Sequence, residues 1–363
     1  MASIYDIAKL AGVSYSTVSL ILNNRGDDLR ISKKTQEKVK QIAKEQGYVP
    51  NVHARKLISK DIKNIPEIAL FWSPTQHPIF LNSMISKLNE MMNEGIVPDM
   101  SVTIYPFEND HLDKMEKILK GNFVHGIIIP VAEEKDIRYL RQLDIQVPVI
   151  TIYRSARKYH SVDVDNYTNG KVAGEIFHML GMKRVGILRN AYSSISFSER
   201  VKGFKEQCRK NSMEIIVDLD RNISKKKSKD PVERYQVGSQ IAEEILAAGQ
   251  APEGIFVQND DSARGAVHTF KKHGIRVPED IAVIAYGHNS NENAEESRLT
   301  LISFPMDELA EKTWQLIGSL LSGGIIKTTR VLCPSRVFFG ASCPKPEAFD
   351  EWMQEKGKVH KKE

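Results

Sequence analysis

Small hydroxyl and amide side chains gather in one short stretch near the N-terminus, AGVSYSTVSLILNN, which spans residues 11–24. Such groups both donate and accept hydrogen bonds, which is the chemistry needed to read base edges in a groove of DNA. The stretch contains no charged side chain. An exposed helix face that only meets water is usually charged, so this composition favours contact with a partner.

Two helices must position this stretch. Apolar residues at helical spacing predict a short helix over residues 5–11, and Gly12 permits the positive φ of a sharp turn. Ser14 is a good N-cap for a second helix. The buried face of that helix is expected to hold Val18, Ile21 and Leu22. This is the helix-turn-helix arrangement, in which the second helix enters the major groove.

A third helix is predicted from its N-cap Ser32 to its C-terminal stop at Gly47. Its apolar stripe consists of Val39, Ile42 and Ala43, and its lysines are Lys33, Lys34, Lys38, Lys40 and Lys44. A plain three-helix bundle with a solvated basic surface would explain the stripe and the lysines. It would not explain the uncharged, hydrogen-bonding surface of the second helix.

The charge of the chain is concentrated in this region. Residues 1–60 hold 11 Lys and Arg against 5 Asp and Glu, whereas the remainder holds 51 − 11 = 40 against 46 − 5 = 41. A basic N-terminal part on a nearly neutral body is typical of a nucleic-acid-binding domain attached to a larger one.

The segment GYVPNVHARKL, residues 47–57, follows the third helix. Pro50 sets the chain extended, and Asn51 is a plausible N-cap for a helix too short to be stable alone. Such a helix could order only on a partner, and its leucine could be wedged between base steps of the minor groove. Alternatively, Leu57 packs against the next domain.

Residues 4–57, with their turn, third helix, Gly-Tyr-x-Pro-Asn and Ala-x-x-Leu in that order, closely resemble the DNA-binding head and hinge of the lactose-repressor/galactose-repressor family of bacterial transcription regulators. The resemblance implies that Tyr15 and Ser16 read bases, and that Leu57 is the minor-groove wedge. The whole set of DNA contacts that we expect is Tyr5, Ser14, Tyr15, Ser16, Thr17, Ser19, Leu20, Asn23, Asn51, Ala54, Arg55 and Leu57.

Two features depart from the family pattern. Leu20 stands where most members carry an arginine directed at guanine, and a leucine offers only apolar contacts, for instance with a thymine methyl. The operator is therefore expected to differ from the common family consensus at that position. The loop at residues 24–32 is also longer than usual, and its acidic Asp27 and Asp28 should point away from DNA.

Short apolar runs alternate with helical segments from residue 67 onward. The strand-like runs are 67–72, 101–107, 126–131, 147–153, 184–190, 214–220, 254–260, 281–287 and 299–304, and helical spacing marks 79–92, 167–180 and 232–248 among others. Runs rich in β-branched residues that alternate with helices predict parallel sheets covered on both faces. So many strands suit two sheets better than one.

The family resemblance, which extends to about residue 340, implies the same α/β fold: two doubly wound parallel-sheet subdomains of periplasmic-binding-protein type with a ligand between them. We therefore expect a helix-turn-helix domain over 1–49, a hinge over 50–62 and an effector-binding and dimerisation domain over 63–345. Its N-subdomain should comprise about 63–165 and 304–330, and its C-subdomain about 166–303 and 331–345. The charged tail, 346–363, is expected to be disordered.

Ligands of open α/β sheets bind beyond the carboxyl ends of the strands. Two family motifs lie at such ends: SFSERVKGF, whose arginine is Arg200, and VQNDDSARGA, with Asn259 and Asp260. By resemblance, Arg200 grips effector hydroxyls or a carboxylate. Otherwise Arg200 would form a surface salt bridge with Glu199 or Glu206.

Other positions of the expected cleft have lost polar groups that the family uses for sugars. Gly287 and Tyr153 stand where aspartates are common, and Phe304 where glutamine is frequent. The effector-binding set that we expect is Trp72, Ser73, Phe80, Tyr153, Arg154, Tyr192, Phe197, Arg200, Asn259, Asp260, Gly287 and Phe304. The aromatic residues favour a sugar or glycoside stacked on rings. A nucleoside or purine, or a protein corepressor, is the alternative.

Other functions find little support in the sequence. It contains no Gly-rich phosphate loop, no His-Glu-x-x-His and no Gly-x-Ser-x-Gly, and its three cysteines lack metal-ligand spacing. We therefore expect no enzyme, no metal and no cofactor. Without an apolar h-region or a membrane-length apolar run, a cytoplasmic protein is expected, rather than a sugar-binding transport receptor.

One head can read only a short half-site, so a homodimer is expected on a near-palindromic operator, with a tetramer as the alternative. Effector binding in the cleft would change the separation of the two hinges and thereby the affinity for DNA.

Overall fold

The computed structural model describes residues 4–22, 31–46, 65–74, 76, 78–120, 123–190, 195–221, 230–249, 251–288, 299–323 and 327–359. The chain forms two compact units, Met1–Ile65 and Pro66–Glu363, called here the head and the body. Within the described residues, no helix has the length and apolar character that crossing a bilayer requires.

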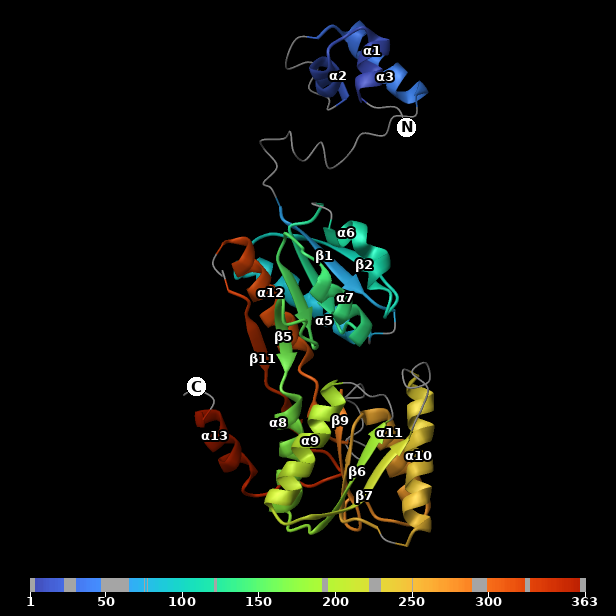
Figure 1. The fold of residues 1–363 in the computed structure, drawn as a ribbon, viewed down its shortest axis with the longest axis vertical. Coiled ribbons are helices and arrows are strands. Elements are labelled where there is room, and N and C mark those ends of the chain that lie inside the picture. The colour runs from blue at the N-terminus through green and yellow to red at the C-terminus, as the bar shows by residue number, and fades with distance from the viewer. Residues whose placement is uncertain are drawn as a thin grey trace. The chain divides into compact units, whose positions relative to one another are not determined.

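The head contains the three helices that the sequence predicts: α1 (Ile4–Ala11), α2 (Tyr15–Leu22) and α3 (Lys33–Glu45), shown in blue in Figure 1. Gly12 has a φ of 68°, which turns the chain between α1 and α2. The N–H of Thr17 donates to Oγ of Ser14 at 3.1 Å, so Ser14 caps α2 as expected.

The core of the head confirms the predicted apolar faces. The buried residues are Ile7, Ala8, Ala11, Val18, Ile21, Val39 and Ala43, with Val13, Leu22, Ile31 and Ile42 packed against them. The N–H of Thr35 donates to Oγ of Ser32 at 3.2 Å, so Ser32 caps α3. Lys38 is not a free surface charge: its Nζ donates to the carbonyl of Ala11 at 3.0 Å, where α1 ends.

The body consists of two lobes, each built on one six-stranded sheet. The sheet of the N-lobe has the order β11-β5-β4-β3-β1-β2, and all its pairs are parallel. The elements of the N-lobe are β1 (Glu67–Trp72), α5 (Pro78–Asn93), β2 (Ser101–Pro106), η1 (Leu112–Met115), α6 (Glu116–Lys120), β3 (Gly126–Pro130), α7 (Glu134–Gln142), β4 (Val149–Ile152), β5 (His160–Val164), α12 (Met306–Leu321) and β11 (Arg330–Cys333).

The sheet of the C-lobe has the order β12-β10-β9-β8-β6-β7, and only the pair β10–β12 is antiparallel. The elements of the C-lobe are α8 (Asn166–Met179), β6 (Arg184–Asn190), α9 (Ile195–Lys210), β7 (Glu214–Arg221), α10 (Pro231–Ala247), β8 (Gly254–Val257), α11 (Asp260–Lys272), β9 (Ala282–Gly287), β10 (Thr300–Ser303), β12 (Arg336–Phe338) and α13 (Phe349–Val359). The two lobes are the doubly wound parallel sheets that the sequence predicts.

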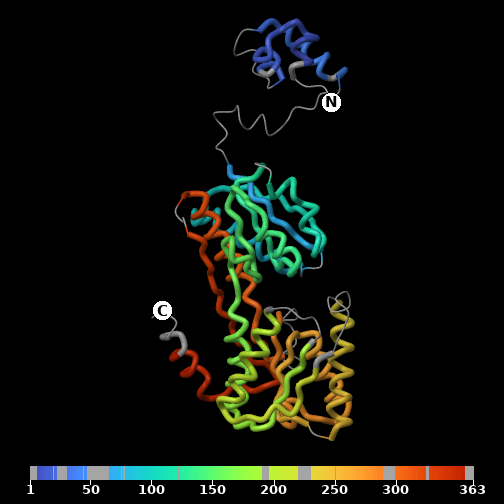
Figure 2. The backbone as a smooth tube through the Cα atoms, viewed as in Figure 1, coloured from blue at the N-terminus to red at the C-terminus, as the bar shows by residue number. Residues whose placement is uncertain are grey.

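The chain passes between the lobes from β5 to α8, from β10 to α12 and from β11 to β12. Figure 2 shows the green and red segments running side by side there, as the pairing of β5 with β11 requires. Each lobe has an apolar cluster on both faces of its sheet, which explains why the central strands are uniformly apolar.

Two expectations about the C-terminal part are wrong. Because β11 belongs to the N-lobe sheet, the last passage between the lobes follows Cys333, and residues 331–333 are not part of the second subdomain. The tail that was expected to be disordered contains α13. Phe349 is buried, and its ring lies 4.9 Å from that of Phe339 and 6.1 Å from that of Trp352. The prediction of disorder rested on the charged residues after 356 and did not take Phe349 and Trp352 into account.

Candidate functional site

The start of α2 forms an exposed, polar and uncharged surface of the head. Tyr15 is 41% exposed, Ser14 and Ser16 are exposed, and Thr17 and Leu20 are half-buried. The Oγ atom of Ser14 lies 2.9 Å from that of Ser16 and 2.8 Å from Oγ1 of Thr17. The opposite face of α2, with Val18 and Ile21, lies in the core. Packing thus directs the uncharged hydrogen-bonding groups outward.

Several expected DNA contacts cannot be placed in this way. Tyr5 and Ser19 lie within α1 and α2. Outside the described residues lie Asn23, Asn51, Ala54, Arg55 and Leu57, and with them the loop that carries Asp27 and Asp28. Their roles stay predictions. Lys33 and Lys34 are exposed at the first turn of α3 and supply positive charge to the head.

Arg200 is the centre of the polar site in the body. It belongs to α9, and its side chain is fully buried. Its Nη1 donates to Oδ1 of Asn166 at 2.6 Å and to the hydroxyl of Tyr153 at 3.2 Å, and its Nε donates to Oε1 of Gln258 at 3.0 Å. The surface salt bridge with Glu199 or Glu206 is therefore the wrong interpretation.

Two aromatic rings enclose the guanidinium group. Its Cζ lies 3.8 Å from the ring centroid of Tyr286 and 4.8 Å from that of Phe197. The cation is held against both rings by cation–π attraction. We call Tyr153, Asn166, Phe197, Arg200, Gln258 and Tyr286 the Arg200 cluster.

Glycines let α9 lie close enough to α8 for this arrangement. A Cβ atom on Gly170 would come within 2.0 Å of the carbonyl oxygen of Arg200, and one on Gly203 within 2.0 Å of the carbonyl oxygen of Tyr167. The two helices therefore pack backbone to backbone. This contact places Arg200 beside Asn166 at the first turn of α8.

A run of rings connects the Arg200 cluster with the N-lobe. Tyr153 lies 5.1 Å from Phe304, Phe304 lies 5.7 Å from Phe80, and Phe80 lies 5.9 Å from Trp72, measured between ring centroids. The structure thus brings six predicted effector residues into one continuous set: Trp72, Phe80, Tyr153, Phe197, Arg200 and Phe304. Phe304 also lines a hollow of about 960 Å³ between α5 and the start of α12.

Asn259 caps the helix that follows it. The Oδ1 atom of Asn259 accepts from the N–H of Ser262 at 2.9 Å and so caps α11. Asp260 lies 3.6 Å from the guanidinium of Arg264, and burial raises the pKa of its carboxyl. A Cβ on Gly287 would lie 2.6 Å from Cγ of Asp260, so the side chain of Asp260 fills the space beside this glycine.

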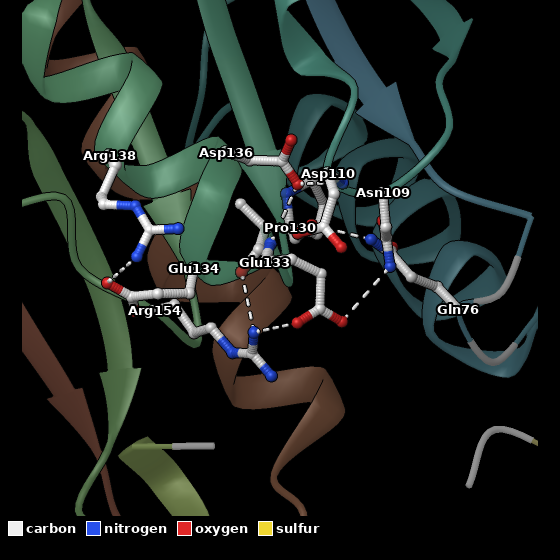
Figure 3. Close-up of polar contacts among 10 residues, drawn as sticks. Gln76, Asn109, Asp110, Pro130, Glu133, Glu134, Asp136, Arg138 and Arg154 are labelled. Atoms are coloured by element: carbon white, nitrogen blue, oxygen red, sulfur yellow. Dashed lines mark hydrogen bonds and ion pairs between the residues drawn. The ribbon is translucent and has the colours of Figure 1, made fainter. Parts of the chain in front are cut away.

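Arg154 follows Tyr153 but belongs to another network, shown in Figure 3. Its Nη1 donates to Oε2 of buried Glu133 at 2.7 Å and to the carbonyl of Ala132 at 3.1 Å. Asp136 accepts from the N–H groups of Asp110, Leu112 and Glu133 in the same network. These contacts fix the loop after β3 against the loop after β4. Ser73 is fully buried after β1, and Tyr192 lies outside the described residues.

Sequence reasoning missed three members of the Arg200 cluster: Asn166, Gln258 and Tyr286. Gln258 and Tyr286 adjoin predicted site residues in the chain, at the carboxyl ends of β8 and β9. Their position at strand ends could have identified them as site residues. Asn166 lies at the start of a helix, where the rule about strand ends does not apply.

Known protein families match parts of both the head and the body. A family described as "Bacterial regulatory proteins, lacI family" matches residues 3–51, and one described as "Periplasmic binding protein-like domain" matches residues 175–343. A relative from Bacillus subtilis (strain 168), "Probable HTH-type transcriptional repressor ExuR", is 26% identical over 92% of this chain and 95% of its own length.

The lactose operon repressor of Escherichia coli (strain K12) is 25% identical over 92% of this chain and 89% of its own length. A crystal structure of the lac repressor dimer bound to operator and the anti-inducer ONPF has the same fold, with a TM-score of 0.62 and 22% identity, over 94% of this chain and 98% of that one. The chain therefore joins a domain of the lacI family of bacterial regulatory proteins to a periplasmic-binding-protein-like domain, and it is similar to these repressors over nearly their whole length.

Proposed function

We propose that the protein is a sequence-specific DNA-binding transcriptional repressor of a carbohydrate-utilisation operon, whose operator affinity is controlled by a small effector, a sugar or glycoside. The observation that carries this proposal is the uncharged, exposed start of α2 on a basic head, in the same chain as a two-lobed body with a buried arginine. The lactose operon repressor, whose name links it to a sugar operon, is similar over nearly its whole length.

The head supplies the DNA-reading part. Tyr15 and Ser16, near the N-terminus of α2, are the side chains that we assign to base edges, and Lys33 and Lys34 those that we assign to phosphates. Leu20 is half-buried in the same helix and offers only apolar contact. A homodimer would present two such heads to a near-palindromic operator.

The body supplies the regulation of operator binding. Tyr153 comes from the end of β4 in the N-lobe, whereas Asn166, Arg200, Gln258 and Tyr286 come from the C-lobe. An effector that contacts Arg200 would therefore act on both lobes at once. A coupling energy of about 1–3 kcal/mol between the two sites would change operator affinity by roughly 5- to 150-fold.

We assign residues 1–49 to DNA binding, residues 50–62 to the hinge and the remainder to effector binding and dimerisation, in the cytoplasm. The effector residues that we propose are the rings from Trp72 to Phe304 together with the Arg200 cluster. Arg154 and Asn259 would act by holding the surrounding loops, because their side chains bond to Glu133 and to the start of α11.

Selection from a random double-stranded DNA library tests the proposal. The full-length protein is expected to enrich a near-palindromic sequence with two half-sites, and Ser16→Ala is expected to lose this enrichment. Lys120→Ala, in α6 of the body, is the control and should select the same sequence. Recovery of unrelated sequences by the unaltered protein would contradict a sequence-specific regulator.

A further inference from the structure

The contacts of Arg200 leave its positive charge without a counter-ion. The three groups that accept hydrogen bonds from it, on Tyr153, Asn166 and Gln258, are neutral. No carboxylate in the described part of the chain forms an ion pair with it. A fully buried and uncompensated guanidinium is costly, because burial removes the hydration that would stabilise the charge.

Two hydrogen-bond donors beside this charge are buried and unused. Nη2 of Arg200 and Nε2 of Gln258 have no partner among the described residues. Nη2 shares its carbon with Nε, Nε2 shares its carbon with Oε1, and Nε and Oε1 are 3.0 Å apart. Each unused donor is therefore attached to a carbon whose other nitrogen or oxygen takes part in this same hydrogen bond.

A third group lies at the same place. The hydroxyl of Tyr286 is buried beside the hydroxyl of Tyr153 and the guanidinium of Arg200, and burial raises the pKa of this phenol well above its usual range. It stays protonated and can donate. A ligand that satisfies these three groups must offer several acceptor oxygens and a negative charge.

Four carboxylates of the body have other partners. Asp260 lies beside Arg264, Asp163 accepts from Nε of Arg330 at 3.0 Å, and Glu133 accepts from Arg154. Asp165 caps α8 through the N–H of Thr168 at 2.9 Å.

We propose that the effector carries a carboxylate, as a sugar acid does, which binds Nη2 of Arg200 and Nε2 of Gln258 and supplies the missing counter-charge. This inference rests on the proposed function, because it names the chemical class of the effector of that same site. A carboxylate matches a guanidinium beside a second donor, since its two oxygens accept hydrogen bonds in one plane. The rings of Tyr153 and Phe304 would face the remainder of the sugar.

Gln258 offers a sharp test. Its Oε1 accepts from Nε of Arg200 at 3.0 Å, so Gln258→Glu places a carboxylate oxygen at that same position. The two side chains have the same shape and differ by one negative charge beside Arg200. A comparison between Gln258→Glu and the unaltered protein therefore isolates the counter-charge.

The first experiment needs no ligand. At neutral pH, Gln258→Glu is expected to melt above the unaltered protein, by about 2–4 °C for each kcal/mol that the new ion pair contributes. Asp113→Asn, at an exposed position in η1, is the control. It measures how a change of one unit in the net charge of the protein affects the melting temperature. Equal melting temperatures for Gln258→Glu and the unaltered protein, after this correction, would overturn the missing counter-charge.

The second experiment measures calorimetric binding of matched acids and neutral sugars to the full-length protein: D-glucuronate against D-glucose, and D-galacturonate against D-galactose. At least one acid is expected to bind about tenfold more tightly than its neutral partner, a difference of about 1.4 kcal/mol. Gln258→Glu is expected to bind that acid about tenfold more weakly than the unaltered protein does.

Neutral sugars that bind as tightly as their acids, or acids that do not bind at all, would overturn the carboxylate. The proposed function is judged separately, by operator binding with and without each sugar. A neutral sugar that changes operator affinity, where the acids do not, would support the proposed regulator and contradict the acidic effector. Absence of sequence-specific DNA binding would remove the regulator itself.

Discussion

The hydroxyl of Tyr153 accepts a hydrogen bond of 3.2 Å from Nη1 of Arg200, and this bond joins the N-lobe to the C-lobe. Tyr153 also packs edge-on against Phe304, which follows the strand that leads from the C-lobe to α12. One tyrosine thus contacts both the arginine assigned to the effector and a passage between the lobes. Movement of the lobes must break or reform these contacts.

Tyr153→Phe tests the energy of this link. It keeps the ring but removes the hydroxyl, and a hydrogen bond to a charged group contributes about 1.5–3 kcal/mol. The variant is expected to melt lower than the unaltered protein and to respond to effector with an altered midpoint. Tyr105→Phe, whose ring stacks on Phe71 in the same lobe, is the control. Equal losses in both variants would argue against a special role for the Tyr153 hydroxyl.

Gly170→Ala tests the close packing of α8 on α9. The new methyl group would lie 2.0 Å from the carbonyl oxygen of Arg200, so the helices must separate and the Arg200 cluster must shift. Overpacking of this kind costs about 1–3 kcal/mol, and more where backbone blocks the space. We expect reduced stability, measured by denaturant unfolding, together with a weakened effector response.

Gly318→Ala provides the control, since its Cβ would meet Pro98 and Val97 at 3.4 Å, which is ordinary contact within α12. Because alanine favours helices by up to about 1 kcal/mol over glycine, this variant should be neutral or more stable. Similar destabilisation by both substitutions would contradict the packing argument.

Ser16→Ala and Lys34→Ala should weaken DNA binding in different ways. Loss of a base contact is expected to cost about 1–3 kcal/mol on the selected operator and little on unrelated DNA. Loss of a phosphate contact should weaken binding to all sequences and lower the salt dependence by about one unit of slope. Anisotropy titrations at several salt concentrations distinguish the two, and identical profiles would contradict the assigned roles.

Phe349→Ala tests whether α13 belongs to the core of the C-lobe. Truncation of a buried phenylalanine typically costs about 3–5 kcal/mol, so the melting temperature should fall by several degrees. Met353→Ala, at a position 36% exposed in the same helix, should change stability by less than about 0.5 kcal/mol. If both variants unfolded like the unaltered protein, α13 would contribute nothing to the fold.

Periodicity predicted most of the framework. The helices of the head and the apolar strands of both sheets were found because each has a regular buried face. Strand β5 was not predicted because its sequence, His160–Val164, mixes polar and apolar residues. Strands β11 and β12 were not predicted because they are short edge strands with exposed side chains. Edge strands depend on their neighbours more than on their own residues.

The site was only partly predictable for a related reason. Arg200 could be identified from its motif, but its burial between Tyr286 and Phe197 depends on how α9 meets β9 across the C-lobe. Likewise, the hydrogen bond to Asn166 depends on glycines that bring two helices into backbone contact. Such contacts between distant segments leave no periodic pattern in the sequence.

The most direct test of the central claim is the affinity for the selected operator, measured at increasing concentrations of the compound that most raises the melting temperature among sugars and sugar acids. The account predicts an at least fivefold change in operator Kd, about 1 kcal/mol of coupling, which saturates at the compound's own Kd and is lost in Arg200→Gln. An operator Kd that stays constant while the compound binds would contradict it.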